Sequence, residues 1–555
     1  MTTPYGTTQF AYGSTNGNER FLNATDPLAR TERVEFIQGV STMPFSDPAA
    51  LVPQGLIAPF NEYLNYRDTY YWDKHAYAVS AGDYTKAHQR HWTHLAVNDY
   101  PVPITADTLE SVKYPLENRV WFNYPGQTIY NLGTAVSASY NQPTKIARVL
   151  DDGTTQMTQH TYNNFGHVTD VIDPVGRETQ YTYAANQIDM LQVQQRTSTS
   201  GFSTPATFSY NSAGQLTRAT NALGQTTTYD YDSPGYLTRT VNANDQTASS
   251  YTYDSLGRVA TSTDSEGYTV TYAYDIFNRI TSETYPDGTA RKFTWNRLDV
   301  GSVTDRQGRT TTYTYDAMRN LIDVQDPLGR HTKFGCFENG SLASLTDPKG
   351  NSTAWSIDIQ NRVIGETYAN GSQIADTYEN TTSRLKAITD TLGQVKQYAY
   401  NVDDSLAGIS HLKAVNATPS VSFVYDQYFQ RPISMTDGSG TTTYTYQPIG
   451  SLGIMTRIST IAASRPSATA EPLASTNSPQ RRKTTSPRSR KAPQTEAHGL
   501  RRPGLTVTIA LTGCCRDNPQ PGRYMPTATI QRTTSPTFVR FQQTRAPATT
   551  TLIKS

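Results

Sequence analysis

The chain has 555 residues, a formal net charge of +1 and a hydrophobic fraction of 36%. It holds no run of about 18 apolar residues, so a membrane-spanning helix is not expected, and three cysteines do not indicate a disulfide framework. The first residues do not combine a charged segment with an apolar one, so no signal peptide is expected, and export would need a dedicated secretion machine or a partner.

The small net charge conceals two unlike segments. Ser464 to Ser555 contains 15 Lys and Arg against 3 Asp and Glu, whereas residues 1–463 contain 33 against 44. Tyrosine follows the same division, because only Tyr524 of the 37 tyrosines lies beyond residue 460. The sequence therefore predicts an acidic, tyrosine-rich body and a basic tail.

Residues 1–36 are predicted to form a first repeat. Phe10-Ala-Tyr12 has the aromatic alternation of a strand, and Asp26-Pro-Leu-Ala-Arg30 matches a turn that returns later at Asp326 to Arg330. Because the chain opens on a repeat, we expect that further sequence could lie upstream, which the DNA before the start codon would test.

Residues 37–130 lose the period and are predicted to be a β-rich insertion. Within it, His88, His91 and His94 have three-residue spacing, with His75 and Asp83 nearby. A helix would gather the three imidazoles for a zinc ion, but a strand turns His91 away from the other two. The alternation of aromatic and polar residues favours a strand, so surface or packing histidines are the preferred interpretation.

Residues 131–460 are predicted to be a repeat array. A Tyr-x-Tyr-Asp signature returns about every 21 residues, and such a period indicates one supersecondary unit stacked many times. Its second aromatic position falls at Tyr210, Tyr231, Tyr253, Tyr274, Trp295, Tyr315, Cys336, Ile357, Tyr378, Tyr400, Tyr425 and Tyr446.

Each repeat is predicted to be a β-hairpin followed by a linking turn. Tyr251-Thr-Tyr253 and Thr269-Val-Thr-Tyr272 alternate as half-buried strands do. Asp254 to Arg258 and Asp264 to Gly267 are turn signals, because Asp bonds the backbone ahead of it and Gly accepts positive φ. Serial hairpins extend one antiparallel sheet, whose twist of roughly 20 to 25° per strand pair forces it to wind into a spiral that encloses space.

Two side-chain rows are expected from this stacking. Paired tyrosines two residues apart share one face and would form a stacked aromatic spine. Arginines that follow the turn glycine or asparagine would form a second row, each paired with a repeat aspartate. The arginines are Arg258, Arg279, Arg309 and Arg330.

The consensus resembles the YD repeat of bacterial Rhs proteins and of the C component of insecticidal Tc toxin complexes. Tyr253-Asp-Ser-Leu-Gly-Arg258 and Tyr315-Asp-Ala-Met-Arg-Asn-Leu321 are clear copies, and Leu116 to Gly126 is similar to stretches that precede such arrays. The likeness covers nearly all of residues 1–460. It implies an all-β YD-repeat β-solenoid, with antiparallel hairpins wound into a shell.

The resemblance also implies a function, which is to enclose a toxic C-terminal polypeptide for interbacterial competition or host intoxication. The expected partners are that toxin polypeptide or a shell-capping protein and a component of the secretion machine. Members of this family continue with a core that plugs the shell and a toxin, and no such motif follows Tyr446. The chain is thus interpreted as a shell truncated before these parts.

No enzyme motif is found, so no catalytic residue and no cofactor are predicted. The sequence contains no Gly-x-Ser-x-Gly, Walker loop, His-Glu-x-x-His or dinucleotide fingerprint. Secretion or display at the cell surface by a non-classical route is expected, with the cytoplasm as the alternative compartment. An alternative function is a cell-surface adhesin whose exposed aromatics contact glycans.

Residues 461–555, rich in Ser, Thr, Pro and Arg, are predicted to be a disordered basic tail. We favour a frameshift as their origin, because codons for Tyr-Asp read one base late encode Thr-Thr. Thr484-Thr-Ser-Pro487 and Thr533-Thr-Ser-Pro536 fit this interpretation. It predicts that another reading frame restores Tyr-Asp-x-x-Gly-Arg past codon 460.

Overall fold

One antiparallel sheet runs through the computed structural model from strand β3 to strand β38, and each strand pairs with the next in the chain. The structure describes residues 1–15, 19–57, 61, 63–95, 104–127, 141–416, 418–446 and 452–458. The chain divides into two units, Met1–Cys515 and Arg516–Ser555, and every described residue lies in the first. The predicted tail, 461–555, lies outside the described residues.

The N-terminal part of the sheet carries most of the irregular structure. A separate hairpin, β1 with β2, precedes it. The first helix, α1, begins after Asp73, whose side chain accepts a hydrogen bond from the Ala76 amide. The elements are β1 Thr2–Thr3, β2 Gly6–Thr7, β3 Gln9–Thr15, β4 Glu19–Thr25, β5 Thr31–Gly39, η1 Ala49–Leu51, β6 Tyr66–Trp72, α1 Lys74–Ser80, η2 Tyr84–Lys86, β7 His88–Leu95, β8 Ile104–Lys113 and β9 Val120–Asn123.

The stretch 37–130 is continuous with the sheet, because β6, β7, β8 and β9 pair within it. The helix α1 packs on β5 and β6, where a small hydrophobic core forms. Tyr70 and Trp72 are fully buried there. The buried residues of this core are Val40, Tyr70, Trp72, Ala76 and Ala87.

From β10 onward the strands are short and regular, as the period predicts. They are β10 Lys145–Val149, β11 Thr155–Tyr162, β12 Val168–Ile172, β13 Glu178–Tyr183, β14 Met190–Arg196, β15 Phe202–Tyr210, β16 Leu216–Asn221, β17 Thr226–Tyr231, β18 Leu237–Val241, β19 Thr247–Tyr253, β20 Val259–Asp264, β21 Thr269–Tyr274, β22 Ile280–Thr284, β23 Ala290–Asn296 and β24 Asp299–Thr304. The later strands are β25 Thr310–Tyr315, β26 Leu321–Gln325, β27 His331–Cys336, β28 Leu342–Thr346, β29 Ser352–Ile357, β30 Val363–Thr367, β31 Gln373–Tyr378, β32 Leu385–Asp390, β33 Val395–Tyr400, β34 Leu406–Leu412, β35 Val421–Tyr425, β36 Pro432–Asp437, β37 Gly440–Tyr446 and β38 Leu452–Ile458.

A register shift recurs at one place in each hairpin, directly before the second aromatic position. In the β19–β20 hairpin, Thr252 pairs with Thr261 but Tyr253 pairs with Val259. The same shift occurs at Tyr274, Trp295 and Tyr315. Because a bulge bends its strand and increases the local twist, a bulge in every repeat bends the sheet in the same direction each time.

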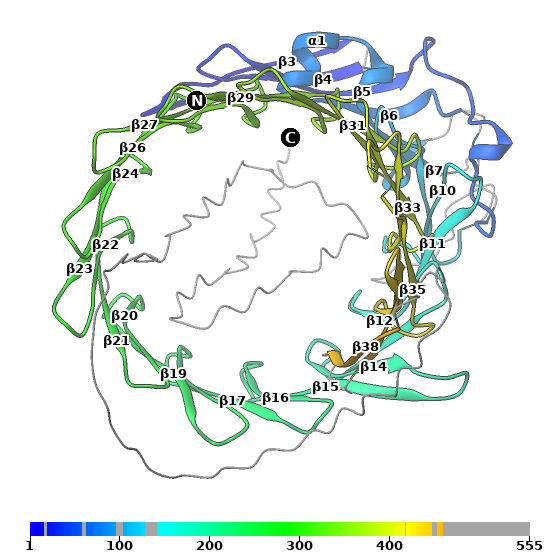
Figure 1. Cartoon of the computed structure of the whole chain (residues 1–555). Coiled ribbons are helices and arrows are strands. Elements are labelled where there is room, and N and C mark those ends of the chain that lie inside the picture. Colours follow the sequence, from blue (N-terminus) through cyan, green and yellow to red (C-terminus); the bar gives the residue numbers. More distant parts are fainter. Residues whose placement is uncertain are drawn as a thin grey trace, which may run out of the picture. The chain divides into compact units, whose positions relative to one another are not determined.

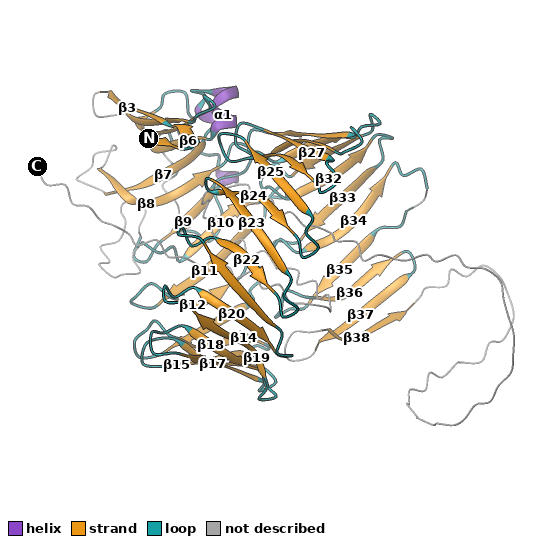
Figure 2. Cartoon of the chain, turned by 90° about the vertical axis from the view of Figure 1, so that its left-hand side faces the viewer, coloured by secondary structure: helices purple, strands orange, loops and turns teal. Residues whose placement is uncertain are grey.

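The sheet of the first unit curves round until it meets itself (Figure 1). Seen from the side, the late strands β33 to β38 lie beside the early strands rather than inside them (Figure 2). Contacts between residues 226 to 308 positions apart confirm this, as in the hydrogen bonds from Arg177 to Asp403 and from Arg30 to Glu338. The predicted fold class, all-β hairpins wound into a solenoid-like shell, is therefore confirmed.

The array is a single layer of sheet. Buried apolar residues gather between Val40 and Leu150, whereas within the described residues of β11 to β38 only Phe334 and Ala387 are buried and apolar. The array must therefore be held by contacts between neighbouring repeats and between successive revolutions.

Candidate functional site

We call the curved sheet of the repeat array the wall. The aspartate at the first position of the repeating turn closes that turn. In the turn between β19 and β20, Asp254 Oδ1 accepts hydrogen bonds from the amides of Leu256 at 2.9 Å and Arg258 at 3.0 Å. The Arg258 amide is the main reason why the pKa of Asp254 lies below its usual value. Gly257 has a φ of 75°, a backbone conformation that glycine adopts without strain.

The arginine of this turn joins one repeat to the next. Arg258 Nε donates to Asp254 Oδ2 at 2.7 Å, and Nη1 donates to the Asp275 carbonyl of the following turn at 3.1 Å. Its guanidinium carbon lies 4.6 Å from the centre of the Tyr274 ring. The predicted Asp–Arg pair is confirmed, and the same arginine also stacks on the aromatic residue of the neighbouring repeat.

The second aromatic residue bonds back to the preceding repeat. The Tyr274 hydroxyl donates to the Val259 carbonyl at 2.9 Å, and burial raises the pKa of Tyr274. The tryptophan at this position makes the same contact, from Trp295 Nε1 to the Ile280 carbonyl. Equivalent bonds are made by Tyr183, Tyr231, Tyr253, Tyr378, Tyr400 and Tyr446.

The predicted spine of tyrosines stacked on tyrosines needs correction. A ring pair exists between Tyr236 and Tyr253, at 4.8 Å, but Tyr236 belongs to a turn rather than to a strand pair. In the strands, the second aromatic residue is held by its hydroxyl bond and by the arginine above its ring. The reason is spacing, because a repeat of two strands places equivalent rings roughly 10 Å apart.

The four arginines predicted as one row lie on opposite rims of the wall. Arg258 and Arg279 follow odd-numbered strands, whereas Arg309 and Arg330 follow even-numbered strands, so their turns alternate between rims. Arg309 and Arg330 pair with the aspartate of their own turn, Asp305 or Asp326. Both pairs are exposed, so solvent screens them and they stabilise the wall little.

The histidines singled out by the sequence lie on strand β7, as predicted, and two of them point to different faces. His88 contacts the rings of Tyr71 and Tyr114. His91 is fully buried on the other face. The side chain of His94 lies outside what the structure describes. Among the described residues, no group of three His, Cys, Asp or Glu side chains is arranged to hold a metal ion.

His91 belongs to a buried charged cluster that the sequence did not reveal. His91 Nδ1 lies 2.9 Å from Asp68 Oδ1, and Nε2 lies 3.5 Å from Glu110 Oε2. Arg67 Nη2 lies 3.3 Å from His91 Nε2. Burial lowers the pKa of Arg67 and raises that of Glu110. All four side chains are inaccessible to solvent or nearly so, which indicates a cross-link of β6, β7 and β8 rather than a reaction site.

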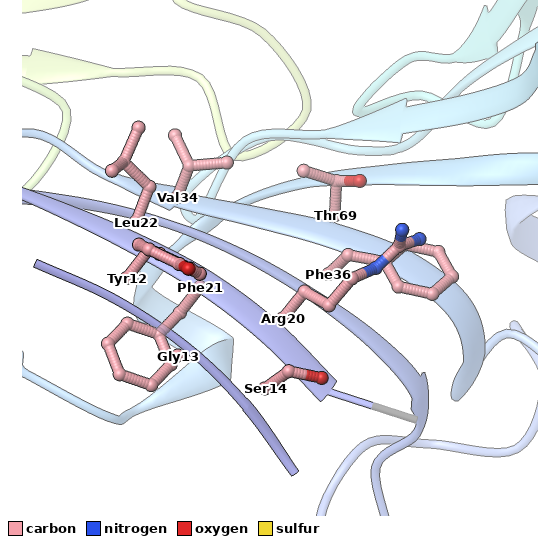
Figure 3. A pocket seen from close by; sticks show the side chains of 9 residues that line it. All are labelled: Tyr12, Gly13, Ser14, Arg20, Phe21, Leu22, Val34, Phe36 and Thr69. Carbon is pink, nitrogen blue, oxygen red and sulfur yellow. The ribbon is translucent and has the colours of Figure 1, made fainter. Parts of the chain in front are cut away.

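A groove of about 460 Å³ lies on the N-terminal strands. Figure 3 shows Leu22 and Val34 side by side on neighbouring strands, with the Arg20 guanidinium near Phe36. Tyr12, which is 87% exposed, forms one wall. The residues that line the groove are Tyr12, Gly13, Ser14, Arg20, Phe21, Leu22, Val34, Phe36 and Thr69.

Two family models match the repeats. A model described as RHS Repeat matches residues 253–290 and 302–331, and a model described as Teneurin YD-shell matches residues 117–261. The chain therefore carries RHS/YD repeats. The matched ranges include the turns at Asp254 and Asp316, so the two models cover part of the repeat array described above. No curated protein matches the sequence.

Solved structures also resemble this RHS/YD-repeat chain. The complex TcdB2-TccC3-TEV has 13% identity and a TM-score of 0.45, over 79% of this chain and 24% of that chain. The Tc holotoxin pore of Photorhabdus luminescens has 13% identity and a TM-score of 0.36, over 81% of this chain and 26% of that chain. The RHS/YD-repeat chain thus spans about a quarter of the length of the solved chains.

Proposed function

We propose that the protein is a noncatalytic shell that encloses a toxic polypeptide following the array, for use against competing bacteria or a host. One observation carries the proposal: the sheet of the first unit returns to itself, and its late turns bond to its early turns. A sheet that closes on itself in this way separates an interior from the surrounding solvent. The match to RHS Repeat and YD-shell models supports a role as a shell.

The mechanism would be steric exclusion. Adjacent strands lie roughly 4.8 Å apart and are joined by backbone hydrogen bonds, so a folded protease cannot pass between them. The wall needs no hydrophobic contents for its own stability, because its repeats are tied by the Asp–Arg–Tyr contacts. A hollow interior is therefore compatible with the single-layer sheet.

Partners and location follow from this proposal. The enclosed polypeptide or a capping protein would be one partner, and a component of a secretion machine another. The described residues contain no helix long and apolar enough to cross a membrane. The adhesin alternative stays a prediction: the groove combines the exposed Tyr12 ring with the polar side chains of Ser14, Arg20 and Thr69, and a glycan-array screen would test it.

The proposal can be tested by placing an unfolded, protease-sensitive reporter on the full chain. In one variant the reporter follows Ser555, and in the control variant it precedes Met1. Enclosure predicts that the reporter after Ser555 is cut more slowly than the reporter before Met1. Equal rates, with the array intact by hydrogen exchange, would contradict the proposal.

A further inference from the structure

The two revolutions of the wall meet through their turns. Turns that follow odd-numbered strands from β23 onward contact the first revolution, mostly at segments that follow even-numbered strands. We call this zone the overlap. Tyr5, in the β1–β2 turn, begins it by accepting a hydrogen bond from the Leu298 amide at 2.7 Å. The cross-overlap contacts include Arg30 with Phe337 and Glu338, Asp73 with Asn361, Glu117 with Gln360 and Ser383, Asp151 with Thr381, Gln156 with Val402 and Asp404, and Gln195 with Tyr428.

The repeat consensus breaks down in several turns of this overlap, although the turn Asp358–Arg362 keeps it. The turn that starts at Phe337 lacks the aspartate, and the turn that starts at Asn401 lacks both glycine and arginine. The turns at Glu379 and Asp426 close on the sixth residue instead of the fifth. These departures place unusual side chains, Asp403 among them, against the first revolution.

The most buried ion pair of the overlap joins Arg177 to Asp403. Their side chains are 8% and 2% exposed. Arg177 Nη1 also bonds Asp173 of its own turn at 3.1 Å, while Nε and Nη2 donate to the Asp426 carbonyl at 3.3 and 3.2 Å. One guanidinium therefore holds two successive turns of the later revolution.

Arginines at the equivalent turn position outside the overlap are exposed, which shows that the overlap is what buries Arg177. Arg309 and Arg330 occupy the equivalent place in the same kind of turn, and their side chains are 59% and 60% exposed. Each pairs with the aspartate of its own turn, as Arg177 does with Asp173. What distinguishes Arg177 is its contact with Asp403 and Asp426.

We propose that Arg177 and Asp403 form a latch that holds the two revolutions together, and that breaking it opens a gap in the wall without unfolding the repeats. A buried charge left without its partner is strongly unfavourable, so loss of either side chain favours separation of the turns. Repeats outside the overlap keep their own Asp–Arg–Tyr contacts and would stay folded. If the proposed shell function holds, this gap is an exit for the enclosed polypeptide.

Hydrogen exchange of the full chain, without any reporter, tests the latch. We expect Arg177→Gln to speed exchange of the amides in Asn401–Ser405 and Asp426–Arg431 by about tenfold or more, with β19–β26 unchanged. Arg309→Gln is the matched control and should leave both turns unchanged. Unchanged exchange in Arg177→Gln would overturn the latch.

A variant in which the charges of residues 177 and 403 are exchanged distinguishes loss of the ion pair from misfolding. Arg177→Asp combined with Asp403→Arg should protect the two turns better than either single variant, because the pair is rebuilt in reverse. If the double variant is no better than the singles, or if exchange rises equally in β19–β26, the latch is overturned. Because these measurements use no reporter, their failure is distinguishable from failure of the shell proposal.

Discussion

At the scale of single residues, the wall depends on three side chains per repeat. Aspartate closes its turn, arginine crosses to the next repeat, and the second aromatic residue bonds back to the preceding strand. The sequence predicted the first task and the Asp–Arg pair from spacing alone. It did not predict the bond from Tyr274 to the Val259 carbonyl, because period-2 alternation gives the face of a ring but not the target of its hydroxyl.

Removing the Tyr274 hydroxyl should weaken the contact between two neighbouring repeats. Tyr274→Phe keeps the ring and the stacked arginine but loses the bond to the Val259 carbonyl, so we expect the free energy of unfolding to fall by about 0.5 to 1.5 kcal/mol. Tyr12→Phe, at a highly exposed ring, is the control and should change little. Denaturant unfolding checks both, and equal effects would show that the hydroxyl bond is not specific.

The Asp403 carboxylate makes the overlap sensitive to acid in a defined range. Burial alone would raise the pKa of Asp403, but hydrogen bonds from Ser405 and Arg177 outweigh it, so its pKa lies below the usual value. Arg177 pairs with Asp403 and also with Asp173, Tyr425 interacts with Asp403 electrostatically, and the adjacent Asp404 pairs with Arg384.

A carboxylate whose pKa is lower in the folded protein stabilises the folded state at pH values above its pKa in the unfolded chain, about 3.9. This stabilisation is lost as the pH falls through the pKa of the folded protein. Protection of the 401–405 turn should therefore persist at pH 5, decline below about pH 4, and lose this dependence in Asp403→Asn. Hydrogen exchange at a series of pH values measures it. Loss of protection between pH 5 and 7 would assign the acid response to a group other than Asp403.

At the scale of elements, the hairpins follow from the sequence, whereas α1 and the buried cluster do not. The turn at Gly267 and the strand Thr269–Tyr274 occupy the predicted places. The helix Lys74–Ser80 was missed, since its capping residue Asp73 lies among aromatics that favour a strand. The partners of His91 were missed as well, because Asp68 and Glu110 come from neighbouring strands rather than from a local motif.

The residue with positive φ in the turn between β20 and β21 allows the geometry of that turn to be tested. Gly267 has a φ of +82° and nothing within 4 Å of an added Cβ atom, so Gly267→Ala should cost about 1 to 2 kcal/mol through backbone strain alone. Asn278, with a φ of 61° in an equivalent position, is the control, because Asn278→Gly should be tolerated. Thermal unfolding compares the two, and a neutral Gly267→Ala would contradict the turn geometry.

Strand β3 should drive association of the chain. Among the described residues β3 pairs with β4 alone, and Gln9–Thr15 contains neither charge nor proline to discourage pairing of its other edge. We expect concentration-dependent association that Ala11→Lys reduces. Sedimentation velocity measures it, with Ser14→Ala as a conservative control, and unchanged association in Ala11→Lys would exclude this edge.

At the scale of the whole molecule, the period predicted the array and its winding but not the register between revolutions. A repeat of about 21 residues specifies contacts with the next repeat, whereas Arg177 and Asp403 are 226 residues apart. A sequence signal of the overlap is the departure from the consensus in the turns that start at Phe337 and Asn401, and sequence reasoning did not use it. The frameshift origin of residues 461–555 stays a prediction for the DNA.

Cross-linking tests the wound sheet most directly. With Cys336, Cys514 and Cys515 replaced, Gln156→Cys combined with Val402→Cys places two thiols at the overlap for a short bifunctional maleimide, because Gln156 Nε2 and the Val402 carbonyl are 2.7 Å apart. A wall that meets itself predicts rapid cross-linking of this pair within one chain and none when Gln156→Cys is combined with Thr314→Cys. If the 156–402 pair fails to cross-link while the array is folded, the sheet does not close on itself and the shell interpretation is wrong.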